Sequence, residues 1–294
     1  MHLDAAKWPM LDRHYGALLD EMQARGDLQG VALAAYTASL HTTWRNVVLR
    51  VLGVQGGWRV LDVGSGLGLL AFELAANLPV QVEGIDLEPD FVAGADDLRR
   101  RLEAEHGFFA GGASVRFGVG DVMAVPFADR EFDLVVVREL MQFLADPVGA
   151  TAELHRVCKP GGHVCVSDID DQLYITWPEP SPAFERLHRA VDEVQRGRGG
   201  DRHVGRKLTT FLRAADFDVA SVLVVPEAQH LASNEVEHRL VLTQLEDART
   251  RIVEEGAMTG ADYDEAMAEL RAEGPHEQFR MNARIVAIGR RPLG

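Results

Sequence analysis

Cysteine is scarce in this sequence. Only two of the 294 residues are cysteines, Cys158 and Cys165, and the segment CKPGGHVC that contains them matches no zinc-binding spacing. We expect both thiols to be reduced and structural, as in most cytoplasmic proteins. The 11 histidines include no HExxH pair and form no cluster with cysteine. The sequence therefore predicts no metal site.

Long hydrophobic runs and a surplus of positive charge are also missing. No apolar run approaches the ~20 residues that span a bilayer, and the first ten residues, MHLDAAKWPM, lack the basic start and apolar stretch of a signal peptide. We therefore expect a cytoplasmic protein without a membrane span. Lys and Arg number 30 against 45 Asp and Glu, which gives a formal net charge of −15. Because phosphate binding needs a clustered basic face, this balance argues against a nucleic-acid partner.

Strand-like and helix-like segments alternate along the chain, a pattern typical of a doubly wound, mostly parallel sheet. A final strand that arrives without a crossover helix from its neighbour is expected to be antiparallel. We predict an α/β, Rossmann-like, doubly wound sheet of seven strands with an antiparallel last strand, N-terminal helices and a helical cap. The expected strands are 58–61, 80–86, 114–121, 132–140, 162–170, 217–225 and 281–292, and the expected helices lie within 10–55 and at 67–78, 89–105, 147–158, 183–196, 205–215, 234–255 and 262–273.

Four segments of one compact domain follow from this pattern. We predict an N-terminal helical lid over 1–55, a ligand-binding Rossmann-like core over 56–170, a substrate-side helical segment over 171–216, and the other sheet strands with a helical insertion over 217–294. The stretch RGRGGDRHVG, residues 196–205, is rich in glycine and arginine, and we expect a flexible loop or hinge there.

The run WRVLDVGSGLG is the most informative feature of the chain. A buried strand leads to Gly64, Gly66 and Gly68, and a helical pattern follows at once. Glycine permits positive φ and has no Cβ to hold a ligand away from the backbone. The dinucleotide fingerprint G-x-G-x-x-G would need its third glycine at the position of Leu69. The turn therefore predicts a nucleotide-like ligand without the pyrophosphate cradle of a dinucleotide site.

Acidic residues stand at the ends of three expected strands: Asp62, Asp86 and Asp121. In an open α/β sheet, ligands bind outside the carboxyl ends of the strands, and a carboxylate about 20 residues past the glycine turn can accept both ribose hydroxyls. Asp86 has that position. Asp121 can accept from an adenine amino group, with the backbone N–H of Val122 beside it and Leu87 against the other face of the ring. Together these residues predict an adenosine ligand.

At this point the sequence resembles the class I S-adenosylmethionine-dependent methyltransferases, over about residues 58–169. VLDVGSGLG resembles their first motif, the ID that ends in Asp86 the second, GDVMAVPFADREFDLVVV the third and fourth, and KPGG the turn before the fifth strand. The branch that methylates ubiquinone or menaquinone precursors and many natural products is the most similar. The resemblance implies S-adenosylmethionine as cofactor and a small-molecule acceptor, with a homodimer left open.

The same resemblance implies roles for individual residues. The three glycines pass under the methionine and ribose parts of the donor, Asp86 binds the ribose hydroxyls, and Asp121 with Val122 binds adenine. Arg138 touches the methionine amino group through its backbone. Gln142 stands where many relatives have histidine, so a base is not expected at that position.

Catalysis of methyl transfer rests mainly on holding nucleophile, carbon and sulfur in line, so a general base is needed only if the acceptor must lose a proton. Our candidate catalytic residues are His41, on the expected lid with Tyr36, Thr42, Trp44 and Arg45, and Glu139 after the fourth core strand. Further acceptor-side candidates, weighed against plain surface roles, are the acidic group Asp168, Asp170 and Asp171, the histidines His188 and His203, and the arginines Arg202 and Arg206.

Three alternatives stay open beside a small-molecule methyltransferase that acts on oxygen, nitrogen or carbon, which we expect in secondary metabolism. A nicotinamide-dependent dehydrogenase shares the glycine turn and Asp86 but lacks the third fingerprint glycine and a Tyr-x-x-x-Lys pair. A cofactor-binding protein or a cyclase would use the sulfonium only for its charge. A macromolecular methyltransferase is disfavoured by the acidic balance. Nothing in the sequence names the acceptor.

Overall fold

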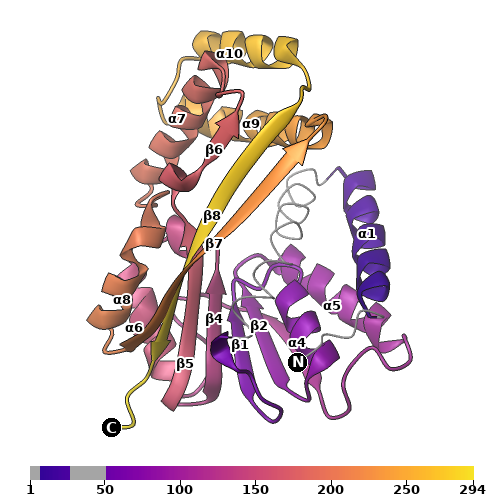
Figure 1. Ribbon diagram of the computed structural model, residues 1–294, viewed down its shortest axis with the longest axis vertical. Helices are drawn as coiled ribbons and strands as arrows, with labels where there is room; N and C mark the ends of the chain where they lie inside the picture. The colour runs from indigo at the N-terminus through magenta and orange to yellow at the C-terminus, as the bar shows by residue number, and fades with distance from the viewer. Residues whose placement is uncertain (1–6, 27–50) are drawn as a thin grey trace.

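The computed structural model describes residues 7–26 and 51–294 (Figure 1). The expected lid residues His41, Tyr36, Thr42, Trp44 and Arg45 lie outside these ranges. The elements, in chain order, are α1 (Trp8–Ala24), β1 (Arg59–Val63), α4 (Leu69–Asn77), β2 (Gln81–Asp86), α5 (Pro89–Glu103), β3 (Ser114–Val119), β4 (Phe132–Arg138), the 3-10 turn η1 (Met141–Phe143), α6 (Pro147–Val157), β5 (Cys158–Ile169), η2 (Asp171–Leu173), β6 (Ile175–Trp177), α7 (Pro182–Gly197), η3 (Val204–Lys207), α8 (Leu208–Ala214), β7 (Asp218–Leu231), α9 (Glu235–Glu254), α10 (Gly260–Glu273) and β8 (Gln278–Arg290).

The sheet has the order β3-β2-β1-β4-β5-β8-β6, and β7 also pairs with β8. Strands β1 to β5 pair in parallel, whereas β8 is antiparallel to β5, β6 and β7. The doubly wound sheet with an antiparallel last strand is therefore confirmed. The described sheet has eight strands rather than the seven expected, because a three-residue strand, β6, lies in a segment too short to show a strand pattern. The order of the strands reverses between β1 and β4, where ligands of such sheets bind.

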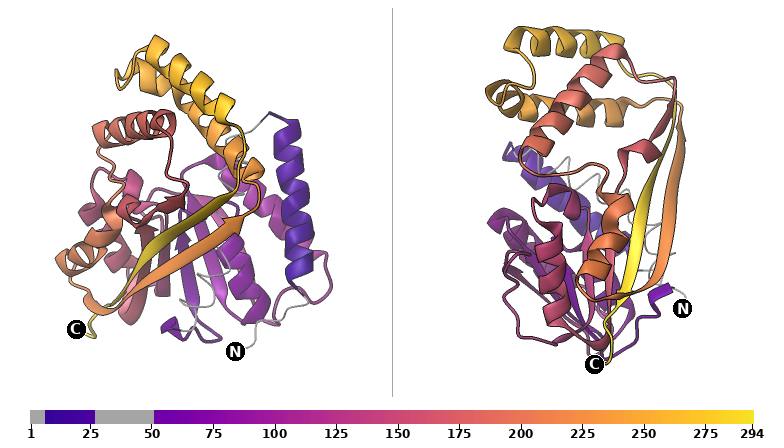
Figure 2. Two further views of the ribbon diagram at one scale, coloured as in Figure 1. Left: turned by 45° about the horizontal axis from the view of Figure 1, so that its top comes forward. Right: turned by 90° about the vertical axis from the view of Figure 1, so that its left-hand side faces the viewer.

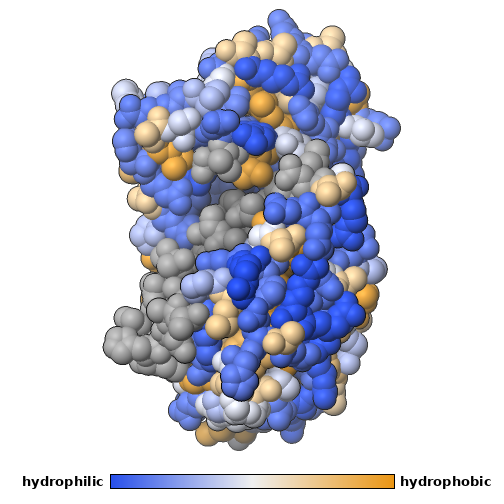
Figure 3. Space-filling model, turned by 90° about the vertical axis from the view of Figure 1, so that its right-hand side faces the viewer, coloured by the Kyte–Doolittle hydropathy of each residue, from blue (hydrophilic) through white to orange (hydrophobic). Residues whose placement is uncertain are grey.

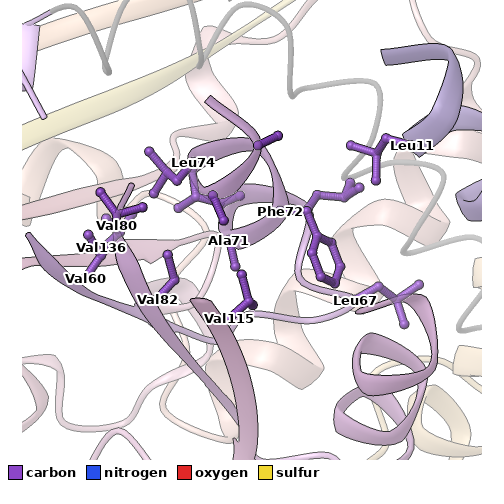
Figure 4. Packing of buried hydrophobic residues seen from close by; sticks show 14 of the residues in the cluster. Leu11, Val60, Leu67, Ala71, Phe72, Leu74, Val80, Val82, Val115 and Val136 are labelled. Atoms are coloured by element: carbon purple, nitrogen blue, oxygen red, sulfur yellow. The ribbon is translucent and has the colours of Figure 1, made fainter. Parts of the chain in front are cut away.

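Alternation along the central strands divides the core into two layers. On β4, Leu134 and Val136 belong to the cluster beneath α4, whereas Val135 and Val137 belong to the cluster beneath α6. Figure 4 shows the first of these clusters, with Leu74 of α4 on the side of Val80 and Val136 and Phe72 on the side of Leu67 and Leu11. Eight of the nine residues of α4 are buried. A sheet covered on both faces explains why its strands read as continuous apolar runs rather than alternating ones.

Helix α1 packs on α5 at one side of the sheet. Leu11 and Leu18 of α1 are buried in the first cluster. At the surface the helices are joined by Arg101, which pairs with Glu21 at 2.7 Å, and by His14, whose Nε2 lies 2.7 Å from Glu105. Figure 3 shows this side of the molecule, where hydrophobic residues form small scattered patches in a hydrophilic surface.

The cap has a hydrophobic core of its own between α7, α9 and α10. Leu187, Ile252 and Met267 are among its buried residues, and the Tyr263 hydroxyl donates to the Leu245 carbonyl at 2.6 Å. The antiparallel ribbon of β7 and β8, 14 and 13 residues long, runs from the sheet to this cap (Figures 1 and 2). β7 therefore continues well beyond the expected end at 225, because β8 offers it partners as far as Leu231.

The stretch 196–205 is bonded to the core rather than being the free hinge we expected. The amide of Asp201 donates to the Gln142 carbonyl at 2.8 Å, and a Cβ on Gly200 would lie 2.7 Å from that same carbonyl oxygen. Gly199, Gly200 and Gly205 therefore serve close packing, whereas a Cβ on Gly197 would meet no atom within 4 Å. Within the described ranges, no helix combines the length and apolar character that crossing a bilayer requires. The division into four segments stays a prediction.

Candidate active site

A cavity of about 220 Å³ opens at the carboxyl ends of β1 and β4, where the strand order reverses. We call it the strand-end cavity. The glycine turn forms its floor, α1 and the ribbon contribute its walls, and the residues after β4 close one side. Its lining residues are Tyr15, Gly64, Ser65, Gly66, Leu67, Leu69, Asp86, Phe91, Arg138, Glu139, Leu140, Phe143, Ser167, Val225, Glu227 and Arg284.

The glycine turn presents bare backbone to this cavity. Gly64 and Gly66 have φ of 72° and 52°, and the Gly64 amide is anchored by donation to the Ile85 carbonyl at 2.8 Å. A Cβ on Gly66 would meet no atom within 4 Å. Gly68 also has positive φ but does not line the cavity: a Cβ there would lie 2.3 Å from the ring of Phe117. Two glycines therefore face the ligand space, and the third lets α4 pack against β3.

Asp86 is fixed by backbone donors at the rim of the cavity. Its Oδ2 accepts from the Gly66 amide at 2.8 Å and its Oδ1 from the Glu88 amide at 3.1 Å. These bonds orient the carboxylate while each oxygen keeps a second lone pair. Each oxygen can therefore accept a further hydrogen bond, and the ribose role of Asp86 stays a prediction.

Asp62 is fully buried behind the turn, and its two carboxylate oxygens have no hydrogen-bond partner among the described residues. Burial raises its pKa to about 6; the charge of Arg138 works against this rise and that of Asp86 adds to it. Buried polar atoms in native proteins are nearly always satisfied. An unpaired carboxylate at this place fits a site whose cationic partner arrives with a ligand.

The three residues predicted for adenine lie outside the strand-end cavity. Leu87 is 62% exposed, and Asp121 is exposed with its Oδ1 accepting from the Met123 amide at 2.8 Å. Val122 is buried. Asp86 connects the two regions, because its carbonyl accepts from the Gly120 amide at 3.0 Å. The predicted adenine site is therefore an open ledge beside the cavity, and the roles of these residues stay predictions.

Glu139 points into the cavity from a strained backbone. Its φ is 54°, outside the range usual for a side chain other than glycine. Its amide donates to the Ser167 carbonyl at 2.9 Å, and its Oε1 accepts from Nε of the buried Arg284 at 2.7 Å. Its Oε2 is buried without a hydrogen-bond partner among the described residues. Strain of this kind is held where the surrounding structure enforces it, often at functional sites.

A second buried carboxylate lies close to Glu139. Asp168 accepts from the Ile169 amide at 2.8 Å and from the Gln142 amide at 3.2 Å. Burial and the nearby charge of Glu139 raise the pKa of Asp168 well above its ordinary range. Burial also raises the pKa of Glu139, against the lowering effect of Arg284. The structure thus joins two carboxyl groups at the carboxyl ends of β4 and β5 with one guanidinium from the middle of β8.

The other acidic candidates are paired with arginine. Arg206 Nε donates to Asp170 at 2.5 Å and Arg202 Nε to Asp171 at 2.5 Å. These arginines therefore bind the neighbouring loop rather than standing free to grip an acceptor. The Nε2 atom of His188 also lies near Asp171, 3.8 Å from its Oδ2.

Histidine and cysteine add no metal site within the described chain. His203 Nδ1 is 4.0 Å from Asp201. Across residues 7–26 and 51–294, no three His, Cys, Asp or Glu side chains are placed to hold a metal ion.

Several cavity residues were not expected from the sequence, and three of them carry titratable side chains. Tyr15 reaches the cavity from α1, Glu227 from β7 and Arg284 from β8. Each lies far along the chain from the glycine turn, and no local motif marks it. The alternation of β8 could have indicated one: Arg284 interrupts the apolar run MNARIVAIG at a position that faces inward.

Comparison with known proteins finds methyltransferases among the relatives of this chain. A methyltransferase domain family matches residues 61–166. The demethylmenaquinone methyltransferase of Thermus thermophilus is 32% identical over 173 residues, 58% of this chain and 70% of that protein. The ubiquinone/menaquinone biosynthesis C-methyltransferase UbiE of Dinoroseobacter shibae is 34% identical over 154 residues, 52% of this chain. This match spans 56% of the length of that relative, little more than half.

Solved structures share the fold. The YcgJ protein of Bacillus subtilis has a TM-score of 0.54 at 17% identity, covering 86% of this chain and 100% of that one. The cyclase SpnF has a TM-score of 0.52 at 22% identity, covering 85% and 80%. With a family match that spans β1 to β5 and a relative 32% identical over 70% of its own length, the chain belongs to the class I S-adenosylmethionine-dependent methyltransferases, in the group that includes the ubiquinone and menaquinone enzymes.

Proposed function

We propose that this protein transfers the methyl group of S-adenosylmethionine to an oxygen, nitrogen or carbon atom of a small molecule, in secondary metabolism. The observation that carries the proposal is a single cavity bounded on one side by the glycine turn and Asp86 and on the other by Glu139 and Arg284. The first side suits the nucleoside end of the donor, and the second offers proton-handling groups to an acceptor. Support for secondary metabolism comes from the sequence resemblance to natural-product enzymes.

The donor is held, on this proposal, by three parts of the chain. Asp86 accepts the ribose hydroxyls, and the backbone of Gly64 and Gly66 lies beneath the ribose and methionine. Asp121 and Val122 bind the adenine on the open ledge. The methionine ammonium is the missing partner of Asp62, since a buried carboxylate without a partner is costly and a cation nearby favours its charged form.

S-Adenosylmethionine supplies a methyl group already activated by its sulfonium. The chain's contribution is to hold the acceptor in line with that group, which is worth roughly 7–11 kcal/mol when the alignment is good. Where the acceptor must lose a proton, Glu139 receives it at Oε2, and Arg284 stabilises the ionised carboxylate through Oε1. Asp168 acts as a positioning residue behind Glu139. The second candidate base, His41, lies outside the described residues and stays a prediction, as do the cytoplasmic location and a homodimer.

The donor test is a titration with S-adenosylhomocysteine and, separately, with NAD⁺, followed by thermal unfolding. A ligand present at about 100 times its Kd stabilises a protein by about 2.7 kcal/mol. We expect stabilisation by S-adenosylhomocysteine only; stabilisation by NAD⁺ alone would overturn the proposal. Asp86→Ala should remove most of the effect while still unfolding cooperatively, and Asp218→Ala, at an exposed aspartate of β7, should retain it.

Transfer itself is tested by the formation of S-adenosylhomocysteine from S-adenosylmethionine in the presence of candidate acceptors. Binding of the donor without any turnover over a broad panel would favour a non-methylating protein or a cyclase instead. The fold similarity to the cyclase SpnF makes that arm of the test necessary.

A further inference from the structure

A second cavity of about 410 Å³ lies where the ribbon meets the cap. We call it the cap cavity. It is bounded by β6, β8, α7, α9 and α10, and its wall includes aromatic, apolar and hydrogen-bonding side chains. Those that matter below are Tyr174, Thr176, Phe184, Leu270, Gln278 and Arg280. None of the sites described above uses it.

One face of the β7–β8 ribbon contributes residues to both cavities. Side chains directly opposite one another in an antiparallel pair share a face, and so do alternate residues of one strand. Val225 is opposite Arg284, and both line the strand-end cavity; Gln278 and Arg280, on the same face of β8, line the cap cavity. The inward face of the ribbon therefore consists of Arg284, Asn282, Arg280 and Gln278 on β8 and of Val225, Glu227, Gln229 and Leu231 on β7.

This face is polar along most of its length. The guanidinium of Arg280 donates from Nη2 to Gln229 Oε1, directly across the ribbon, at 2.8 Å. Arg284 and Arg280 are four residues apart on β8. At about 3.3 Å per residue their Cα atoms are roughly 13 Å apart, with Asn282 midway between them.

Buried polar atoms without partners follow the same line. Glu139 lines the strand-end cavity and Thr176 lines the cap cavity, whereas Asn282 lies between Arg284 and Arg280 on β8 and is not among the lining residues of either cavity. Glu139 Oε2, Asn282 Oδ1 and Thr176 Oγ1 are buried, and none has a hydrogen-bond partner within the part of the chain that the structure describes. Thr176 is opposite Arg280 in the β6–β8 pairing, so it belongs to the same inward face. Native proteins rarely leave such atoms unsatisfied, so partners from outside the chain are expected for them.

We propose that the acceptor is an elongated molecule whose reacting ring occupies the strand-end cavity and whose far end, a polyhydroxylated ring as in a glycoside, occupies the cap cavity. This inference rests on the proposed function. Hydroxyl groups both donate and accept, so they can satisfy the amide oxygen of Asn282 and the hydroxyl of Thr176 together. The rings of Tyr174 and Phe184 give the sugar an apolar wall. A purely hydrocarbon tail would leave this row of polar atoms buried without partners.

The test compares two phenols that have the same hydroquinone head. One carries a sugar, 4-hydroxyphenyl β-D-glucopyranoside, and the other an apolar ring, 4-(cyclohexyloxy)phenol. Each is titrated calorimetrically into protein saturated with S-adenosylhomocysteine. We expect the glucoside to bind at least about tenfold more tightly, as two recovered hydrogen bonds allow. Equal or tighter binding of the cyclohexyl compound, or no measurable binding of the glucoside, would overturn the inference.

Two substitutions locate the sugar. Thr176→Val and Asn282→Leu should each weaken glucoside binding by roughly three- to tenfold and leave the cyclohexyl compound unaffected. Thr176→Ser keeps the hydroxyl and should restore binding, and Thr210→Val, at an exposed threonine of α8, is the matched control. Unchanged glucoside affinity in both Thr176→Val and Asn282→Leu would also overturn the inference. A protein that fails to bind S-adenosylhomocysteine would instead refute the proposed function, which separates the two failures.

Discussion

Replacement of Asp62 by asparagine gives the sharpest physical test of the donor site. The carboxylate is fully buried and lacks a hydrogen-bond partner among the described residues, and burial raises its pKa from 3.8 to about 6. One pKa unit corresponds to about 1.36 kcal/mol, so this difference corresponds to about 3 kcal/mol of folding free energy. The sign follows from the direction of the change: an acid whose pKa is higher in the folded protein opposes folding once it is ionised.

In the wild-type protein the free energy of unfolding should therefore decrease as Asp62 ionises between pH 4 and pH 6, and this decrease should level off above pH 7. Asparagine is isosteric with the protonated acid and does not titrate. The stability of Asp62→Asn relative to wild type should consequently improve by about 2 kcal/mol between pH 4 and pH 7. The size of the stability difference at any one pH depends on how the structure accommodates the buried amide. The change of this difference with pH is therefore the quantity that tests the reasoning.

The assay is urea unfolding of both proteins without ligand at half-unit pH steps, with Asp218→Asn, at an exposed position of β7, as the control. A difference between Asp62→Asn and wild type that stays constant across this range would refute the reasoning. A second readout uses the ligand. If its ammonium pairs with Asp62, the affinity for S-adenosylhomocysteine should rise with pH between 4 and 7 in wild type and change little in the variant, because binding favours the ionised carboxylate.

Three further predictions concern packing, the loop and the base. Gly68→Ala should destabilise the protein by about 2–5 kcal/mol, because the new Cβ would meet the ring of Phe117 and the backbone φ of 79° disfavours a side chain. Gly66→Ala should mainly reduce donor affinity. Thermal unfolding measures the first effect, and titration with S-adenosylhomocysteine measures the second. Arg206→Gln should lower the unfolding midpoint at pH 7. Burial alone would raise the pKa of Asp170, but hydrogen bonds and the Arg206 charge lower it. The ionised Asp170 therefore stabilises the fold above pH 4, and this contribution disappears as the pH falls through the lowered pKa. Glu139→Gln should reduce turnover at least about 100-fold on an acceptor that must lose a proton. The wild-type rate should rise with pH as the Glu139 carboxyl, whose pKa burial has raised, ionises, and the variant should lack this rise. Wild-type rates in the variant would exclude Glu139 as the base.

The glycine-turn side of the candidate site was predictable because it is made of local sequence. Gly64, Gly66 and Asp86 belong to strand ends and a turn whose geometry follows from a short motif, and the structure brings all three to one cavity. The opposite side of the cavity comes from tertiary structure. Arg284 meets Glu139 only because β8 inserts antiparallel beside β5, and Tyr15 reaches the cavity only because α1 packs on α5.

The error in the strand pattern has the same origin. The expected strand 217–225 stops where apolar alternation stops, yet β7 continues to Leu231 with Glu227 and Gln229 on its inward face. A strand whose inward face is polar has no hydrophobic period to indicate it, because the residues that would mark the core are those that face a ligand space. In this protein the strand pattern fails along the stretch of the ribbon whose inward face is polar, between the two cavities. That polar half of the ribbon is where acceptor specificity should be sought.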